Sequence, residues 1–393
     1  MKRAVVLGMA RSGQAAAALL ERNGVEVVRV DRELGNDEDV SLLEGADVLV
    51  KSPGVPRSNP LVAAARIPIW SEVELAAHYL PNPILGVTGT NGKTTTVEWL
   101  GAMFRAAGRE VAVAGNVGRA IAGVEAPPDA WIVCELSSFQ LEDVHELRPR
   151  VAVLINLEPD HLDRHGAFEA YGDAKLRMFA RQAAEDVAVL PRAFGEVPGG
   201  ATRIEFSGDD ELPAEPHLPG PHNRENAAAA TAAARAAGID DASVAEALRT
   251  FEGVPHRIEL VRERDGVRYV NDSKGTNVAA ALRALASFPD DRLHVILGGL
   301  GKREPYEPLA DAFKAGDLAY VIGESAEEIA VALGVAGVSV ERAGTLEAAL
   351  AEAAAAAVPG DVVLLSPACA SFDQFRDFEA RGDTFRELVE ALP

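Results

Sequence analysis

The feature that most constrains this chain is the segment 85–96, LGVTGTNGKTTT, which has the pattern of a buried strand, a glycine-rich turn and the start of a helix. Backbone N–H groups in such a turn point at phosphate oxygens, and the helix N-terminus adds a favourable partial charge. Lys93 would reach the β- and γ-phosphates of a nucleotide, and the Thr94 hydroxyl would face a metal ion. Val87 departs from the general phosphate-loop pattern, which has glycine at that position. The segment predicts a nucleotide site at the edge of a parallel sheet.

Strand-like and helical patterns alternate along the whole chain, which predicts an α/β fold with mainly parallel sheets. Residues 1–82 have a βαβ rhythm and end at the linker LPNPIL (80–85). Residues 83–252 carry the glycine-rich turn and an alanine-rich helix expected over 226–237. Residues 253–393 alternate again, so we expect three α/β domains in series. The expected strands are 4–8, 25–31, 46–54, 84–89, 111–116, 130–137, 151–157, 187–190, 267–272, 293–299, 318–323, 338–343 and 361–368.

Composition excludes several function classes. The net charge of −22, from 38 basic and 60 acidic residues, argues against general binding to nucleic acids or anionic membranes. No apolar run approaches the length of a membrane span, and the N-terminus has the pattern of a strand and turn, not of a signal peptide. The two cysteines, Cys134 and Cys369, lie in apolar runs and favour a reducing compartment. We therefore expect a cytoplasmic protein. Because no coiled-coil seam suggests assembly, we also expect a monomer.

A second glycine-containing turn, Gly8 to Gly13, also follows a strand and opens a helix. Asp31 ends the next strand, where an acidic residue would meet a ribose. The spacing is G-x4-G and not GxGxxG, so a tight packing turn and a nucleotide site both remain open. The turn would also support a nicotinamide dehydrogenase built on the first domain.

Polar residues follow two expected strands of the central segment. Glu135, in CELSSFQL, would lie where ligands gather beyond parallel strands and could hold Mg²⁺, or it is a solvated loop acid. His161 and His165 are four residues apart, which allows a zinc pair, but no HExxH pattern or thiol cluster supports zinc. A single histidine near Mg²⁺ or a surface loop fits better. Lys175 is expected on a helix, where most lysines face solvent.

The last segment has three polar stretches at expected strand ends, NDSKGT (271–276), GGLGK (298–302) and SPACASF (366–372). Each places hydroxyls, amides or a lysine where a small polar ligand could bind. Their recurrence on one sheet edge predicts a binding site there.

Together these motifs resemble the Mur ligase family over nearly the whole chain. The stretches GVTGTNGKTT, ELSSFQL, NLEPDHLDRHG, HNRENA, PHRIE, NDSKGTN, GGLGK and SPACASFDQF stand in family order, and the family's ATP loop has valine where Val87 stands. NDSKGTN and SPACASFDQF match the D-glutamate-adding branch, whereas the Asp-Asn-Pro-Arg signature of the diaminopimelate branch is absent. The resemblance implies a Rossmann-like N-terminal domain, a central P-loop ATPase-type domain and a Rossmann-like C-terminal domain.

The resemblance implies a role for each matched position. ATP would be bound by Thr90, Asn91, Gly92, Lys93, Thr94, Thr95, Thr96, Asn226, Arg257 and Asp272. Two magnesium ions would be held by Thr94, Glu135, His161 and a carbamylated Lys175. The catalytic residues would be Lys93, His161, Lys175 and Arg257. The uridine moiety would meet Gly8, Arg11, Ser12, Asp31 and Arg32, the muramoyl-alanine carboxylate Asn116 and His161, and D-glutamate Thr276, Lys302, Ser371 and Phe378. Further substrate contacts would come from Ser52, Ser137, Lys274 and Phe372.

The implied reaction is the ATP-dependent addition of D-glutamate to UDP-N-acetylmuramoyl-L-alanine in cytoplasmic peptidoglycan precursor synthesis. ATP would convert the poorly reactive carboxylate into an acyl phosphate, and attack by the amine would give a tetrahedral intermediate. Three rival interpretations remain: a folylpolyglutamate synthase-like ligase, a P-loop regulatory ATPase and the dehydrogenase built on the first domain. The first shares the ATP loop and the last two domains but has no nucleotide-sugar domain before the loop, whereas about 80 residues precede it here.

Overall fold

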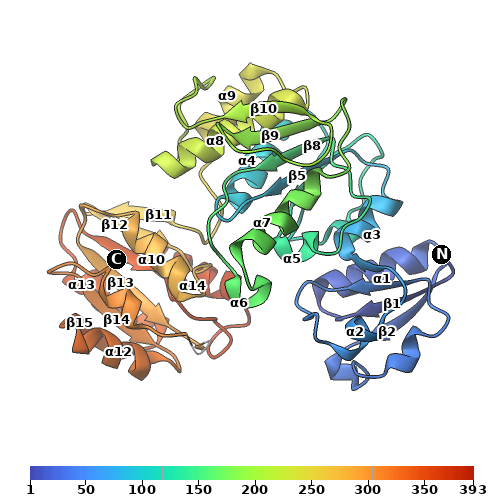
Figure 1. Ribbon diagram of the computed structural model, residues 1–393. Helices are drawn as coiled ribbons and strands as arrows, with labels where there is room; N and C mark the ends of the chain where they lie inside the picture. The colour runs from blue at the N-terminus through green and yellow to red at the C-terminus, as the bar shows by residue number, and fades with distance from the viewer. Residues whose placement is uncertain (117, 302–303) are drawn as a thin grey trace. The chain divides into compact units, whose positions relative to one another are not determined.

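The computed structural model describes residues 1–116, 118–301 and 304–393, apart from the side chains of 162 and 163. They form two compact units, Met1–Phe251 and Glu252–Pro393. The first unit contains a four-stranded and a six-stranded sheet, and the second contains another six-stranded sheet (Figure 1). Paired strands run parallel except for β11 and β12, which confirms the predicted α/β class. The predicted boundaries of three domains stay predictions.

The first sheet has the order β2-β1-β3-β4. Alternate residues of β1 face opposite layers: Ala4 and Val6 pack in a cluster with α1 and α3, whereas Val5 and Leu7 pack in a cluster with α2. This two-sided burial explains why β1 has an uninterrupted apolar sequence. The elements are β1 (Arg3–Leu7), α1 (Arg11–Arg22), β2 (Glu26–Val30), β3 (Val48–Lys51), α2 (Pro60–Ala64), β4 (Ile69–Ser71) and α3 (Glu72–Tyr79).

The central sheet has the order β10-β9-β8-β5-β7-β6, which puts β5 and the turn after it between β8 and β7. One face is covered by α4, α8 and α9, and the alanines of α8 are small enough to let it pack closely on α4. The other face belongs to the same hydrophobic cluster as α1 and α3 of the first sheet. The strands are β5 (Ile84–Thr88), β6 (Val111–Gly115), β7 (Trp131–Glu135), β8 (Val151–Leu154), β9 (Val187–Pro191) and β10 (Thr202–Phe206). The helices are α4 (Lys93–Ala106), α5 (Ser138–Leu141), α6 (Leu162–His165), α7 (Phe168–Leu176), α8 (Pro221–Ala236) and α9 (Asp241–Thr250), with the short 3₁₀ turn η3 (Ile121–Gly123).

The third sheet has the order β11-β12-β16-β13-β14-β15, with helices on both faces. Its carboxyl edge carries the loops after β12, β13 and β16, so the described residues of the three polar stretches expected from sequence lie at one edge of one sheet. The strands are β11 (Glu259–Arg264), β12 (Val267–Asn271), β13 (Leu293–Gly298), β14 (Leu318–Ile322), β15 (Ser339–Gly344) and β16 (Val362–Leu365). The helices are α10 (Val278–Ala286), α11 (Glu307–Ala310), α12 (Ala326–Val335), α13 (Leu346–Ala356) and α14 (Phe378–Glu390).

Three strands were not expected from the sequence: β4, β10 and β11. The alanine-rich helix begins at Pro221, five residues before its expected start, because Pro221 fits the first turn and Gly220 precedes it. β8 ends at Leu154, before the expected 157, so Asn156 lies in the following loop. In the described part of the chain, no helix is long and apolar enough to cross a membrane.

Candidate active site

The glycine-rich turn between β5 and α4 has the conformation that its sequence predicted. Gly92 precedes the first residue of α4 with a φ of 82°, in the left-handed region. A Cβ atom at Gly92 would lie 2.1 Å from Oδ1 of Asn226, a buried residue of α8. Glycine is therefore required here by the backbone and by the close approach of Asn226. The structure thus brings Asn226 against the loop, as the resemblance implied.

Polar groups of the loop are paired within the protein. The Lys93 ammonium donates to the carbonyls of Gly89 (2.7 Å) and Thr90 (2.8 Å). The N–H groups of Thr90 and Asn91 both donate to Oδ1 of Asn156, at 3.0 and 2.9 Å. Asn156 thus holds two amides of the phosphate loop, although the sequence placed it inside the expected strand 151–157 and gave no sign of this role.

Glu135 ends β7, beside the loop. Its side chain is 3% exposed, and Oε1 accepts a hydrogen bond of 3.1 Å from the Asn116 amide. Its Oε2 atom is buried and has no hydrogen-bond partner among the described residues. A buried carboxylate oxygen without a partner is costly unless a ligand satisfies it. An oxygen donor of this kind fits Mg²⁺, which binds through carboxylates, hydroxyls and substrate phosphates.

A cavity of about 240 Å³ lies against the loop. Predicted site residues and unexpected ones line it together: Lys93, Asn116, Ser137, Ser138, Phe139, His161, Tyr171 and Lys175. Of these, Ser138, Phe139 and Tyr171 were missed. The Tyr171 hydroxyl donates to the Thr90 hydroxyl (3.1 Å), which ties α7 to the loop. Thr94, Thr95 and Thr96 are buried in the first turn of α4.

Lys175, on α7, is not the solvent-facing lysine that its type suggests. It is 1% exposed, donates to the Gly89 carbonyl (2.9 Å) and lies 4.6 Å from the Tyr171 ring centre. Burial, reinforced by the Lys93 charge, lowers the pKa of Lys175 from 10.5 to about 7, against the opposing charges of Asp160 and Glu135. A large fraction of this amine is therefore neutral near pH 7.

The two histidines of the loop before α7 have different surroundings. His161 has a φ of 52°, is about half exposed and lies 4.8 Å from the ring centre of Phe139. His165 is buried and contacts Ser138 and Glu142. Among the residues described, no group of three or more His, Cys, Asp or Glu side chains is arranged to hold a metal ion, so zinc gains no support.

The first-domain turn gathers several predicted residues at the carboxyl edge of the first sheet. The Asp31 carboxylate accepts hydrogen bonds from the N–H groups of Met9 (2.5 Å) and Glu33 (2.9 Å). These bonds lower the pKa of Asp31, and the Met9 bond has the larger effect. The Ser52 hydroxyl donates to the Gly8 carbonyl (2.7 Å). Gly13 lets α1 approach the turn, since a Cβ there would lie 1.8 Å from the Gly8 oxygen. Ser12 is half-buried in this turn, whereas Arg11 and Arg32 are exposed, and Arg11 donates to the Gly118 carbonyl.

In the second unit, Asp272 is buried at the end of β12. Its carboxylate accepts from the Ser366 hydroxyl (2.7 Å) and the Ile258 N–H (3.3 Å). Burial raises the pKa of Asp272 to about 6, against the lowering effects of the Ser366 bond and the Arg257 charge. The stretch after β12 and the one after β16 thus meet at Asp272.

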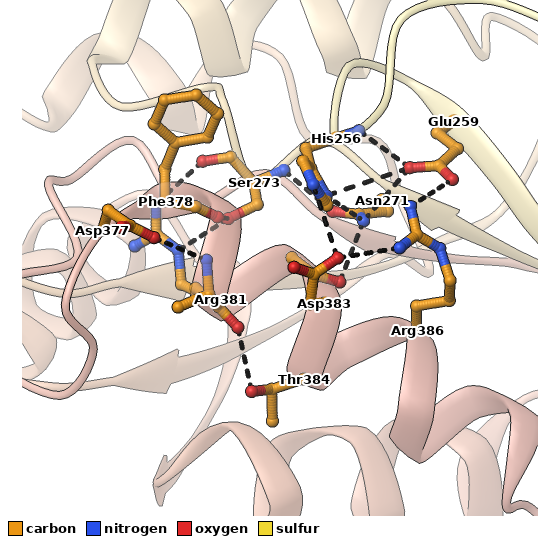
Figure 2. Close-up of polar contacts among 12 residues, drawn as sticks. His256, Glu259, Asn271, Ser273, Asp377, Phe378, Arg381, Asp383, Thr384 and Arg386 are labelled. Atoms are coloured by element: carbon orange, nitrogen blue, oxygen red, sulfur yellow. Dashed lines mark hydrogen bonds and ion pairs between the residues drawn. The ribbon is translucent and has the colours of Figure 1, made fainter.

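Arg381, on α14, was missed by sequence reasoning although it stabilises the same edge. Its guanidinium is fully buried and donates to the hydroxyl (3.0 Å) and carbonyl (2.9 Å) of Ser273 and to the Cys369 carbonyl (3.2 Å). Figure 2 shows Arg381 beside Ser273, whose hydroxyl donates to the Phe378 carbonyl (2.8 Å). Burial lowers the pKa of Arg381 to about 10. Arg381 therefore joins both polar loops to α14.

His256 fixes the segment before β11, next to Arg257. It adopts a φ of 62°, and its ring nitrogens lie 3.0 Å from the Asn271 amide and 3.6 Å from Asp383, as Figure 2 shows. Burial lowers the pKa of His256. The backbone at Arg257 is thus held against the carboxyl end of β12 and against α14.

The remaining predicted residues of the second unit lie around the same edge. Ser371 is buried, and Phe372 beside it is 68% exposed. The Lys274 ammonium lies 5.9 Å from the ring centre of Phe378, and Thr276 is half-buried in the stretch after β12. Lys302 lies outside the described residues.

Comparison with known proteins identifies the family. The Mur ligase middle domain matches residues 87–194, and the Mur ligase glutamate ligase domain matches residues 256–369. A UDP-N-acetylmuramoylalanine–D-glutamate ligase of Sphingopyxis alaskensis is 43% identical, covering 100% of this chain and 98% of its own. A ligase of the same name from Anaeromyxobacter dehalogenans is 42% identical, covering 98% and 97%. The chain belongs to the Mur ligase family.

Solved structures show the same fold. The UDP-N-acetylmuramate-alanine ligase MurC of Thermotoga maritima matches with a TM-score of 0.59 at 20% identity, covering 100% of this chain and 99% of that one. The MurF ligase of Thermotoga maritima, solved with ADP, matches with a TM-score of 0.59 at 20% identity over 89% and 90%. E. coli FolC, solved with ADP, matches with 0.58 at 20% identity over 81% and 92%. The predictions of family, fold and enzyme class, an ATP-dependent amide-forming ligase, are confirmed.

Proposed function

We propose that this Mur ligase adds D-glutamate to UDP-N-acetylmuramoyl-L-alanine at the expense of ATP, as a step of peptidoglycan precursor synthesis. The names of relatives that match this chain over nearly their full length support this assignment. The observation that carries it is the cavity beside the phosphate loop, which combines Lys93, Lys175 and His161 with the buried carboxylate of Glu135 nearby. In this set Lys93 can neutralise phosphate charge, and Glu135 offers an oxygen donor for a metal ion.

Lys93 would supply the positive charge for phosphoryl transfer. Its ammonium donates to two loop carbonyls, and ATP phosphates would replace these contacts. The amides of Thr90 and Asn91, held by Asn156, already point in one direction and could turn to phosphate oxygens. Asn116 and Ser137, which also line the cavity, would orient the substrate carboxylate. Arg257 and Asp272, on the second unit, stay proposed ATP contacts.

Magnesium, when bound, would neutralise phosphate charge and polarise the substrate carboxylate. The residues proposed to hold it are Thr94, Glu135 and His161, and the unpartnered Oε2 of Glu135 is the observation that supports them. The number of ions, two in the prediction, is part of this proposal.

Lys175 would serve as a carbamate. A neutral amine attacks CO₂, forms an N–C bond and releases a proton, so a lysine with a pKa of about 7 is suited to the reaction. The product is an anion and would add a carboxylate-like oxygen donor beside Glu135. Under ¹³C-labelled bicarbonate, a carbamate resonance present in the native chain and absent in Lys175→Ala would support this; equal spectra would remove the carbamate from the proposal.

D-Glutamate would bind at the carboxyl edge of the third sheet. The proposed contacts are Lys274, Thr276, Ser371, Phe372, Phe378 and Lys302. The location is supported by the polar loops after β12 and β16, which meet there around Asp272 and Arg381. A cytoplasmic location and a monomeric state also stay predictions.

The experiment that tests the function is ligation by the purified protein and by Lys93→Ala. We expect the native chain to form UDP-N-acetylmuramoyl-L-alanyl-D-glutamate with one ADP for each product. Lys93→Ala should retain the thermal stability of the native chain and lose turnover by about 10²- to 10³-fold, because loss of one preorganised charge-stabilising group costs about that much. Near-normal turnover in Lys93→Ala would refute the proposed role of the loop.

A further inference from the structure

Glu142 lies at the C-terminal end of α5 and binds three side chains from two parts of the first unit. Its carboxylate is 7% exposed. Oε1 lies 3.4 Å from Nδ1 of His165, and Oε2 lies 3.3 Å from the Arg164 guanidinium and 3.6 Å from Nε of Arg57. The backbone carbonyl of Glu142 also accepts from Arg177. We call Glu142, Arg57, Arg164 and His165 the Glu142 cluster.

One end of the Glu142 cluster forms the wall of the cavity. Nε2 of His165 lies 3.0 Å from the Ser138 hydroxyl, and the His165 ring stacks on Phe139 with 5.6 Å between centres and 19° between planes. The Arg164 guanidinium lies 4.5 Å from the centre of the Phe139 ring. Ser138 and Phe139 both line the cavity, and the Phe139 ring also contacts His161. The position of this wall therefore depends on where Glu142 holds His165 and Arg164.

The other end reaches the loop after β3 of the first sheet. Arg57 belongs to this loop, and Arg164 donates to its Val55 carbonyl at 3.5 Å. Beside Glu142, the Asp143 carboxylate pairs with the fully buried ammonium of Lys51, the last residue of β3, at 2.9 Å. The loop between Lys51 and Arg57 contains Ser52, which bonds the Gly8 turn. The segment 51–57 therefore links the turn of the first sheet to Glu142.

Charge makes Glu142 the critical member of the cluster. It is a nearly buried carboxylate facing two guanidinium groups and an imidazole, so it compensates charges that would otherwise repel each other. Removing one partner of a buried ionic contact leaves the others uncompensated, and the remaining groups rearrange. Because Glu142 contacts both Arg57 and the pair Arg164 and His165, a rearrangement at Glu142 should shift both of these parts of the chain.

We propose that Glu142 is a positioning residue that couples the segment 51–57 of the first sheet to the cavity wall formed by Ser138 and Phe139. Binding of a nucleotide-sugar at the first sheet would thereby set the wall against which its carboxylate is activated. This inference rests on the proposed function for its kinetic part only. Glu142 contacts no reacting group and acts through His165 and Arg164.

Two measurements on Glu142→Gln and Arg57→Gln test the coupling, with Glu146→Gln as a matched control. Glu146 follows on the same segment, is 71% exposed and pairs with Arg181, away from the cluster. The first measurement is hydrogen–deuterium exchange of the ligand-free proteins. In Glu142→Gln we expect faster exchange in both 51–57 and 161–168, with exchange in the rest of the first unit little changed. Glu146→Gln should exchange like the native chain.

The second measurement is steady-state ligation. In Glu142→Gln, kcat/KM for the nucleotide-sugar should fall about tenfold while KM for D-glutamate stays within about twofold, because only transition-state positioning at the cavity is lost. Arg57→Gln should show a smaller loss of the same kind, and the double variant should lose less than the product of the two single losses, as for residues in one network. Unchanged exchange in 161–168, or multiplying losses, would overturn the coupling. Coupled exchange in a native chain without ligase activity would refute the proposed function and leave the coupling standing.

Discussion

Glu72 gives a stability prediction whose sign follows from its surroundings. It opens α3 and is 1% exposed; Oε1 accepts from the Ala122 N–H (2.5 Å), and Oε2 is buried without a hydrogen-bond partner in the described ranges. Burial raises the pKa of Glu72 from 4.5 to about 7, with the Ala122 bond opposing. Between these two pH values the folded state keeps a proton that the unfolded state releases. The free energy of unfolding should therefore fall as pH rises through this window and level off above it.

The magnitude follows from the difference between the two pKa values. From 4.5 to about 7, at about 1.4 kcal/mol for each pH unit, the loss is about 3 kcal/mol. Glu72→Gln removes the ionisation and keeps an oxygen for the Ala122 amide. The glutamine NH₂ group would lack a hydrogen-bond partner, and so does the protonated Oε2 of Glu72 in the native chain. The two proteins should therefore be about equally stable near pH 4.5. At pH 8 the variant should be more stable by about 3 kcal/mol.

Urea denaturation of both proteins between pH 4.5 and 8 is the assay, with the difference in free energy as the readout. Glu74→Gln is a control with the opposite expectation. Both Glu74 oxygens accept backbone N–H groups, from His145, Glu146 and Leu147, and an amide NH₂ cannot accept them. The free energy of unfolding of Glu74→Gln should fall by about 1 to 3 kcal/mol, because a buried donor without a partner costs about that much. A stability difference between Glu72→Gln and the native chain that does not change with pH would refute the reasoning.

Two substitutions test the close approaches at the turns. Gly92→Ala places a methyl group 2.1 Å from Oδ1 of Asn226 at a φ of 82°, so the loop must shift. KM for ATP should rise at least tenfold, which corresponds to a cost of about 1.4 kcal/mol or more. An unchanged KM for ATP would contradict the loop geometry. Gly13→Ala places its methyl group 1.8 Å from the Gly8 oxygen and should separate α1 from the first turn, lowering stability by about 1 to 3 kcal/mol and weakening nucleotide-sugar binding measured by calorimetry. Native-like affinity in a folded Gly13→Ala protein would separate this turn from the proposed uridine site.

Sequence patterns predicted the elements that are buried on both faces. β8 (VAVL) and β16 (VVLL) are continuous apolar runs, and the glycine-rich turn after β5 has few structural solutions. The missed strands lack this signal. β10 (TRIEF) and β11 (ELVRER) are edge strands with half-exposed, charged sequences, and β4 has only three residues. Their strand conformation depends on a neighbouring strand that local sequence does not reveal.

The candidate site likewise contains residues that sequence motifs predicted and residues that only the fold reveals. Lys93, Glu135 and His161 stand in motifs whose spacing indicates their chemistry, and the cavity brings Lys93 and His161 together. Asn156 and Arg381 act through contacts with residues far away in sequence, such as the loop amides of Thr90 and Asn91 or the carbonyl of Ser273. Such contacts follow from the packed fold, so an isolated asparagine or arginine in the sequence carries no sign of them.

The most direct test of the proposed function is phosphate release from ATP by the purified protein with UDP-N-acetylmuramoyl-L-alanine and one amino acid at a time. D-Glutamate, L-glutamate, L-alanine and diaminopimelate should be compared at equal concentration. The proposed function predicts phosphate release with D-glutamate alone, with one phosphate for each ligated product. Release that needs no amino acid would indicate a regulatory ATPase. In a parallel reaction with a folate acceptor, release with L-glutamate would indicate the folylpolyglutamate synthase-like alternative. Either result would contradict the proposal.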